Sequence, residues 1–266
     1  MGKKVEGSSY MSQNPNRHIY TKIYTENNVT LDKIISSYDR WLINFYFSLI
    51  DKYGTGKDVL DLCCGSGSLL LPKFHLMKSA IAVDFSSMML NALKRNLIGV
   101  IPDNLKLILG DANYLALEEG IVDFVYSITS LYHIPNVDKA IREAGRVLRP
   151  GGIAALELGN LYSINTIVCD RYFKEQSWAK SYHIPYHDMR RFLSQAGLKV
   201  LEQRSFQLTP NYGVPRSLFY LQPVAGRYLK RILGVTIHGR MLDEYISSLW
   251  PLKFFSFRHM FICQKQ

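Results

Sequence analysis

The chain has 266 residues, 47% of them hydrophobic, and a formal net charge of +10 at pH 7. This length and composition can bury one sizeable core, and an α/β domain of this size need not be divided. No window of about 18 uncharged apolar residues occurs, so no membrane-spanning helix is expected. The four cysteines lack the spacing of a metal site, so no metal ligand is assigned and reduced thiols in the cytoplasm are expected.

The first 53 residues are predicted to contain a leader and then helices. Residues 1–15 have no hydrophobic run and do not resemble a secretory signal, which predicts a disordered leader. Residues 16–53 carry apolar and aromatic side chains at spacings of three and four, which places these side chains on one face of each helix. We interpret this segment as N-terminal cap helices.

Five apolar runs follow between residues 57 and 160, and helical patterns lie between them. This alternation predicts right-handed crossovers and a parallel sheet. A helix is predicted over 186–196, where Gly197 ends it, and a sixth strand over about 199–208. We assign residues 54–209 to the core of the domain.

The C-terminal part of the chain is predicted to return to the core after an insertion. Residues 210–255 are interpreted as a cap insertion with amphipathic helices over 223–233 and 240–249. Residues 256–266 then supply the final strand of the core, predicted over 257–263.

The run from Val59 to Ser68 carries the most specific signal. An apolar strand pattern contains Asp61 near its end, Gly65 and Gly67 follow at a spacing of two, and a helical pattern begins just after. Glycine in such a turn allows backbone N–H groups to approach a bound molecule. The next apolar run ends in Asp84, at the position where a carboxylate binds a ribose diol.

Two absences narrow the choice of ligand. Leu70 stands where the third glycine of the dinucleotide fingerprint should be, and the chain has no Gly-Lys-Ser/Thr phosphate loop. A ligand with adenosine but no phosphate fits this pattern better. A third apolar run ends in Asp111, whose carboxylate is suited to accept a hydrogen bond from an adenine amino group.

These motifs together resemble the class I S-adenosylmethionine-dependent methyltransferases, and the chain is similar to their ubiquinone/menaquinone-biosynthesis group (methyltransferase type 11). The resemblance covers about residues 58–160 and, more weakly, 182–209. Its most specific parts are the glycine loop, Gly110-Asp111-Ala112, Leu131-Tyr132-His133-Ile134-Pro135 and Arg146-Val147-Leu148-Arg149-Pro150-Gly151-Gly152. It implies a Rossmann-like α/β fold: a doubly wound, mostly parallel seven-stranded sheet with a helical cap, in which the final strand is antiparallel and lies next to the sixth.

The resemblance also implies a set of residues that bind S-adenosylmethionine. Asp61 would order the loop and face the positive methionine end, and Asp84 would bind the ribose. The other cofactor-binding candidates are Cys63, Gly65, Gly67, Phe85, Met89, Asp111, Ala112, Ser127 and Tyr24. Cys63 stands at the first glycine position of the family, so we expect it to keep a non-glycine conformation while Gly65 and Gly67 make the close approach.

Several candidates have a structural alternative. Asp61 and Asp111 are also suited to capping a following helix, Phe85 and Met89 to the core, and Tyr24 and Tyr38 to ordinary helix packing. Ser127 and Thr129 follow the fourth strand, where the sulfonium lies in similar enzymes.

His133 is the leading candidate for the base that removes a proton from a hydroxyl acceptor. The alternative is a structural imidazole packed beside Tyr132. His183 and His187 are weaker candidates, and His187 with Asp188 more simply begins a helix.

The acceptor is expected to be a small molecule methylated at oxygen, with carbon as the less favoured atom. The 17 Tyr, 13 Phe and 3 Trp favour a hydrophobic, aromatic or lipid-linked acceptor, although aromatic residues also simply fill cores. The alternatives are an RNA- or protein-modifying methyltransferase and a non-catalytic relative that only binds the cofactor.

The excess of basic residues near the C-terminus does not decide which partner the protein binds. Residues 200–266 contain nine basic and three acidic residues, and 227–231 alternate basic with apolar side chains. A solvated helix face is the simplest interpretation, a peripheral contact with an anionic membrane is the main alternative, and nucleic acid is the least favoured partner.

Overall fold

A computed structural model describes residues 37–98, 100–167, 170, 180–208 and 232–266. Its centre is a seven-stranded sheet with the order β3-β2-β1-β4-β5-β9-β6. The strands are β1 (Asp58–Leu62), β2 (Ser79–Asp84), β3 (Leu105–Leu109), β4 (Val122–Ser127), β5 (Leu148–Gly159), β6 (Leu198–Phe206) and β9 (Arg258–Lys265). Strands β1 to β5 pair in parallel, whereas β9 is antiparallel to both β5 and β6. The predicted doubly wound, mostly parallel seven-stranded sheet is therefore confirmed.

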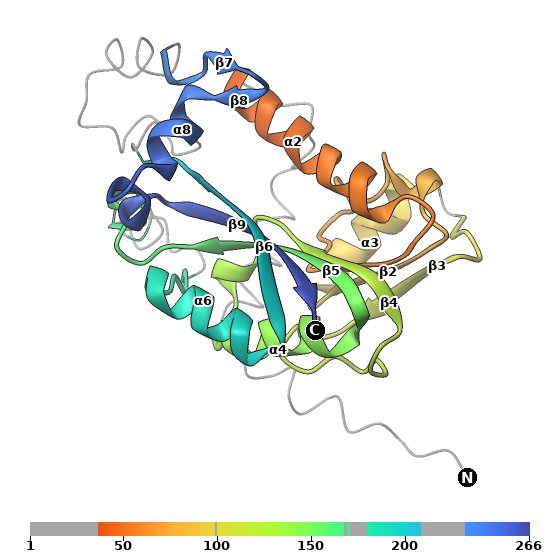
Figure 1. The fold of residues 1–266 in the computed structure, drawn as a ribbon. Helices are drawn as coiled ribbons and strands as arrows, with labels where there is room; N and C mark the ends of the chain where they lie inside the picture. The colour runs from red at the N-terminus through yellow and green to blue at the C-terminus, as the bar shows by residue number, and fades with distance from the viewer. Residues whose placement is uncertain (1–36, 99, 168–169, 171–179, 209–231) are drawn as a thin grey trace.

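Helices cover both faces of this sheet (Figure 1). On one face lie α2 (Ser37–Gly54) and α3 (Ser87–Asn96), and on the other α4 (Val137–Val147) and α6 (Tyr186–Gln195). Consecutive strand residues enter opposite layers, as a side-chain period of two requires. Phe124 and Ile262 belong to the α2/α3 layer, whereas their neighbours Val125 and Phe261 belong to the α4/α6 layer.

The described part of the N-terminal helices is a core layer. α2 buries Leu42, Phe45, Leu49 and Ile50 against the sheet. Residues 37–53 therefore pack against one face of the sheet and do not form a cap over its strand ends. Residues 16–36 lie outside the described part of the chain.

The insertion contains a hairpin that its sequence pattern did not predict. Instead of a helix from residue 240 onwards, β7 (Thr236–Ile237) pairs with β8 (Arg240–Met241), and α8 spans only Leu242–Ser248. His238 and Gly239 both have positive φ, 48° and 76°, as a two-residue hairpin turn requires. The helix predicted over 223–233 lies outside the described residues except for its last two.

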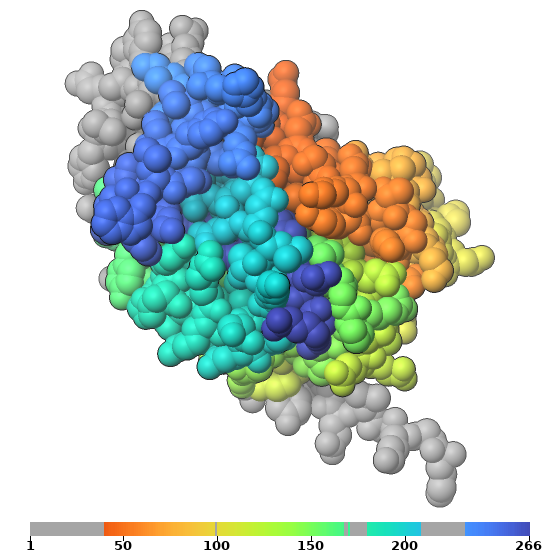
Figure 2. Space-filling view, in the orientation of Figure 1, coloured from red at the N-terminus to blue at the C-terminus, as the bar shows by residue number. Residues whose placement is uncertain are grey.

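Charged and polar side chains attach α8 to the edge of the sheet. Arg204 on β6 binds both carboxylate oxygens of Glu244, each at 2.5 Å, and its guanidinium lies 4.0 Å from the centre of the Phe45 ring. Asp243 accepts the backbone N–H of Gln207 at 2.8 Å. Figure 2 shows these C-terminal segments packed beside β6 and reaching the N-terminal end of α2, where Trp41 donates to the carbonyl of Gly239.

A buried charge cluster joins α2 to the centre of the sheet. Glu157 on β5 is fully buried and accepts hydrogen bonds from the Tyr46 hydroxyl of α2 and from Arg258 Nη1 of β9, the latter at 3.2 Å. Burial and the neighbouring carboxylate raise the pKa of Tyr46, so its hydroxyl stays protonated and donates.

Within the described residues, no helix is both long enough and apolar enough to cross a membrane.

Glu157→Gln is expected to lower the free energy of unfolding by about 3 kcal/mol. The Arg258 guanidinium is mostly buried, and the substitution removes the negative charge of the Glu157 carboxylate beside it. The matched control is Asp138→Asn, which breaks an exposed pair with Arg142 and should change stability by about 0.5 kcal/mol or less. Urea unfolding followed by circular dichroism measures both. Equal effects of the two substitutions would contradict the role given to Glu157.

Candidate functional site

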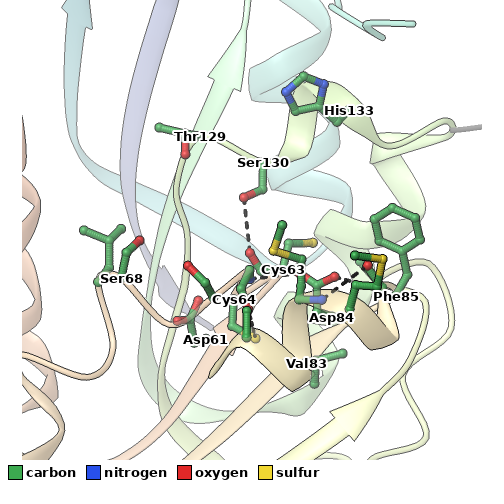
Figure 3. A pocket seen from close by; sticks show the side chains of 18 of the residues that line it. Asp61, Cys63, Cys64, Ser68, Val83, Asp84, Phe85, Thr129, Ser130 and His133 are labelled. Carbon is green, nitrogen blue, oxygen red and sulfur yellow. Dashed lines mark hydrogen bonds between the residues drawn. The ribbon is translucent and has the colours of Figure 1, made fainter. Parts of the chain in front are cut away.

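A cavity of about 370 Å³ opens at the carboxyl ends of β1, β2, β3 and β4 (Figure 3). Four segments line it: the loop after β1, the end of β2 with the start of α3, the turn after β3 and the loop after β4. β1 lies between β2 and β4, so the crossovers leave the sheet in opposite directions on either side of it. A doubly wound sheet places its ligand at such a switch point.

The loop after β1 uses left-handed backbone at three positions, Cys63, Gly65 and Gly67, with φ of 65°, 56° and 77°. The expectation that Cys63 keeps a non-glycine conformation is wrong: its backbone adopts the left-handed conformation that a glycine at this position would adopt. The hydrogen bonds that hold the loop include those from the Cys64 N–H to the Val83 carbonyl at 3.0 Å and from the Ser130 hydroxyl to the Cys63 carbonyl at 3.3 Å. These tertiary contacts maintain a conformation that L-residues rarely adopt.

The two glycines have different roles. Gly65 lines the cavity, and among the described residues a Cβ there would have only the Met89 sulfur within 4 Å, at 4.0 Å. A Cβ at Gly67 would lie 2.9 Å from the Leu93 side chain of α3. Gly67 is not among the cavity-lining residues, and its small size allows the close packing of the loop against α3.

Asp84 joins the two loops that form the cavity floor. Its carboxylate accepts the Gly65 N–H and the Ser86 N–H, each at 2.9 Å, and the residue is 5% exposed. Burial raises the pKa of Asp84, and the backbone hydrogen bonds oppose that rise. Each carboxylate oxygen has a further lone pair, so Asp84 can fix the loop and still accept from a ligand.

Asp61 faces the cavity from β1 and accepts a hydrogen bond from the Tyr126 hydroxyl of β4 at 2.9 Å. This hydrogen bond joins β1 to the neighbouring strand β4. The motif instead predicts that Asp61 orders the glycine loop. Burial and the nearby Asp84 raise the pKa of Asp61 to about 7. In the ligand-free protein this carboxyl is therefore partly protonated near neutral pH.

The predicted adenine end is assembled from three segments. Phe85, Met89, Asp111 and Ala112 all line the cavity. The Asp111 carboxylate accepts the backbone N–H of Asn113 at 2.9 Å, so it closes a turn rather than capping a helix.

The segment after β4 differs from the prediction at Ser127. Ser127 is fully buried and is absent from the cavity lining, and its hydroxyl has no hydrogen-bond partner among the described residues. Thr129, Ser130 and His133 line the cavity in its place. Tyr24 and the Tyr38 side chain lie outside the described part of the chain.

His133 ends the short helix η4 (Leu131–His133) and lies at the opposite end of the cavity from Asp61 (Figure 3). Burial, with the neighbouring His183 and Arg258, lowers the pKa of His133 to about 3. Its imidazole is therefore neutral at pH 7 and can accept a hydrogen bond or a proton, although it is a weak base until a substrate changes its surroundings. His187 is exposed on α6 beside Asp188, as the helix-start interpretation requires.

Comparison with known proteins identifies the domain. Residues 60–156 match the family model described as a methyltransferase domain. A demethylmenaquinone methyltransferase of Staphylococcus aureus (strain MRSA252) is 34% identical over 101 residues, which are 37% of this chain and 41% of that protein. The chain thus spans about two fifths of the length of this curated relative.

Solved structures agree on the fold. A chain from the complex between the Haloferax volcanii Trm112 methyltransferase activator and a methyltransferase has a TM-score of 0.61 at 17% identity, with 94% of this chain and 96% of that chain covered. An N-methyltransferase of Haemonchus contortus, in complex with phosphomonomethylethanolamine and S-adenosylhomocysteine, has a TM-score of 0.58 at 14% identity, covering 84% of this chain and 52% of that one.

Residues 60–156 form a class I methyltransferase domain. The sheet order, the cavity at its switch point and the matching sequence all belong to this class.

Sequence reasoning missed part of the lining of this methyltransferase domain. Ser66, Ser68 and Leu69 from the glycine loop, and Ser130 from the loop after β4, also face the cavity. Ser86 carried a usable signal, because a serine two residues after a strand-ending acid, just before an apolar helical pattern, is a helix N-cap. Its hydroxyl does accept the Met89 N–H, at 3.4 Å.

The raised pKa of Asp61 predicts a pH effect on stability. Between about pH 4 and 7 the folded protein keeps a proton that the unfolded chain has lost, so the stability of the wild type falls as pH rises and levels off above about pH 7. The difference in melting temperature between the wild type and Asp61→Asn, measured from pH 5 to 8, should shift in favour of the variant as pH rises. A difference that does not change with pH would show that Asp61 is ionised throughout.

Proposed function

We propose that the cavity binds S-adenosylmethionine and that the protein transfers its methyl group to a hydroxyl oxygen of a small hydrophobic or aromatic acceptor. The single observation that carries the proposal is the placement of Asp61, Asp84 and Asp111 in one cavity at the carboxyl ends of three adjacent strands.

The charge of the cavity fits this cofactor. Among the described residues, three carboxyl groups face the cavity, against one guanidinium, that of Arg95 at the exposed rim. A cation such as a sulfonium or an ammonium gains Coulomb energy there, while a phosphate would be repelled. Asp84 has free lone pairs for a ribose diol, and Asp111 lies with Phe85 and Met89, which can contact an adenine ring.

When bound, S-adenosylmethionine supplies an electrophilic methyl group on a positively charged sulfur. The residues need to hold the acceptor about 3 Å from the methyl carbon and in line with the breaking carbon–sulfur bond, which supplies much of the acceleration. As the carbon–oxygen bond forms, the acceptor loses a proton. The neutral imidazole of His133 is the group at this end of the cavity that is able to take it.

Aromatic side chains support the proposed acceptor class. The Tyr132 ring lies beside that of His133, with centroids 4.5 Å apart and an angle of 54° between the ring planes, and the Phe257 ring centroid lies 6.3 Å from that of Tyr132. The S. aureus relative is named for a quinone substrate, which agrees with an aromatic acceptor. A ring carbon is the second acceptor atom to test. A polymer-modifying enzyme and a non-catalytic binder remain the alternatives that the experiments below separate.

Asp84→Asn should weaken the binding of S-adenosylmethionine and S-adenosylhomocysteine about ten- to hundredfold, because it removes the charged acceptor of the ribose hydroxyls and loosens Gly65. Isothermal titration measures this, with Asp103→Asn as the control, since Asp103 is an exposed carboxylate outside the cavity. Unchanged affinity in Asp84→Asn would remove the basis of the proposed cofactor site.

Methyl transfer itself is tested with tritiated S-adenosylmethionine. We expect label in catechol or in reduced demethylmenaquinone, with at least tenfold lower kcat in His133→Phe and little change in cofactor affinity. Label in total RNA or in protein would favour a polymer-modifying enzyme instead. Tight cofactor binding with no labelled product from any of these would favour the non-catalytic alternative.

A further inference from the structure

Two segments expose a group of large hydrophobic side chains to solvent. They are residues 160–167, which follow β5, and residues 232–257, which lie between β6 and β9. Six of these side chains, each more than half exposed, define what we call the apolar surface: Tyr162, Ile164, Ile167, Leu249, Trp250 and Phe255. Single exposed hydrophobic residues are normal in soluble proteins, whereas a group of them marks an interaction site.

Hydrogen bonds hold the two segments side by side. The side-chain amide of Asn160 donates to the carbonyl of Phe254 at 2.7 Å and to that of Ser256 at 2.9 Å. The Lys253 N–H in turn donates to the Leu249 carbonyl at 2.8 Å. The exposed side chains that follow β5 and those that follow α8 therefore belong to one region of the molecular surface.

The helix α8 extends this region toward the hairpin. Asp243 and Glu244 of α8 are buried, whereas Tyr245 and Leu249, four residues apart, are exposed. Residues four apart lie on the same side of a helix. The Tyr245 hydroxyl donates to the Ile237 carbonyl of β7 at 3.3 Å, so the exposed side of α8 continues into the hairpin.

The charges that these segments show to solvent are positive. Residues 160–167 contain no charged side chain, and residues 232–257 contain Arg240, Lys253, Asp243 and Glu244. Asp243 and Glu244 are each 1% exposed, because they accept hydrogen bonds from Gln207 N–H and from Arg204. Residues 209–231, outside the described part of the chain, have four basic residues and no acidic one in their sequence.

This charge decides between two candidate occupants. In a two-fold contact with a second copy of the chain, the same surface faces itself, so Arg240 and Lys253 would meet positive charge and no exposed carboxylate of these segments. An anionic phospholipid surface supplies phosphates for the cations and hydrocarbon for the isoleucine and leucine side chains. Tryptophan and tyrosine are also favoured at the boundary between headgroups and hydrocarbon.

The apolar surface lies at the edge of the sheet that carries the cavity. Arg258 at the start of β9 pairs with Gly159 at the end of β5 and with Phe206 at the end of β6. The two segments therefore lie beyond the carboxyl ends of β5 and β6, and the cavity opens at the carboxyl ends of β1 to β4. Figure 1 shows α8 and the hairpin beyond the end of β6.

We propose that the apolar surface docks on an anionic phospholipid membrane, with Leu249 and Trp250 among the lipids and Lys253 at the level of the phosphates. Docking is a property of this surface and does not depend on the chemistry of the cavity. Its use rests on the proposed function: a hydrophobic acceptor dissolves in membranes, and docking brings the cavity edge of the sheet to that source.

Vesicle flotation of the full-length protein tests the proposal, with vesicles of phosphatidylcholine alone and with added phosphatidylglycerol. The wild type should bind the anionic vesicles about tenfold more tightly or better, and added salt should weaken this binding. The double variant Leu249→Ser, Trp250→Ser should bind them about tenfold more weakly, and Lys253→Gln about fivefold more weakly.

The matched control is the double variant Ile98→Ser, Val100→Ser. These side chains are 92% and 74% exposed, and they lie between α3 and the start of β3, at the opposite edge of the sheet. This variant should bind vesicles as the wild type does. All variants should keep the wild-type melting temperature and affinity for S-adenosylhomocysteine, because the changed side chains are not part of the cavity lining.

Three vesicle results would overturn the proposal: no binding of the wild type to anionic vesicles, equal binding to both kinds of vesicle, or undiminished binding of the Leu249→Ser, Trp250→Ser variant. A dimer of the wild type in sedimentation velocity that this variant abolishes would also overturn it, because the surface would then belong to a second copy. Failure of the wild type to bind S-adenosylhomocysteine would instead reject the proposed function and leave the vesicle result standing.

Discussion

The site depends on one buried carboxylate, that of Asp84. Its two oxygens accept N–H groups from the loop after β1 and from the start of α3, so a single side chain sets the distance between two walls of the cavity. The left-handed backbone at Cys63 and Gly65 is kept by this attachment and by the contact of Cys64 with Val83. Without Asp84 the loop would lose the partner that holds it in a conformation with few alternatives.

Burial acts in opposite directions at the two ends of the cavity. It raises the pKa of Asp61 to about 7 and lowers that of His133 to about 3, so both groups are held toward their neutral forms in the ligand-free protein. A bound cation would draw Asp61 back toward the carboxylate, whereas His133 stays available as an uncharged acceptor. The same physical effect thus favours the neutral form at both ends of the cavity, a carboxylic acid at one end and an imidazole at the other.

The cluster of Glu157, Tyr46 and Arg258 lies near the His133 end of the cavity, since Arg258 lies over the ring of Tyr132, the neighbour of His133. Glu157 balances Arg258, and Tyr46 joins this pair to α2, so one cluster connects α2, β5 and the antiparallel strand β9. Because Arg258 also lies over the Tyr132 ring, a charge that stabilises the sheet at the same time lowers the pKa of His133 and of His183. Glu157 and Arg258 thus contribute both to the stability of the fold and to the protonation state of the histidines.

The sequence by itself determined the order of the core strands and helices from β1 to β6 and the placement of Asp61, Asp84 and Asp111 in one cavity. Strand periodicity is local, and the carboxyl ends of parallel strands meet at one edge of the sheet, so acids near those ends must converge. Only the tertiary structure decided that Gly67 serves packing, that Ser127 is buried, and that His183 lies beside His133. The roles of Gly67 and His183 depend on Leu93 and Gly159, which are distant from them in sequence, and such contacts leave no periodic signal in the chain.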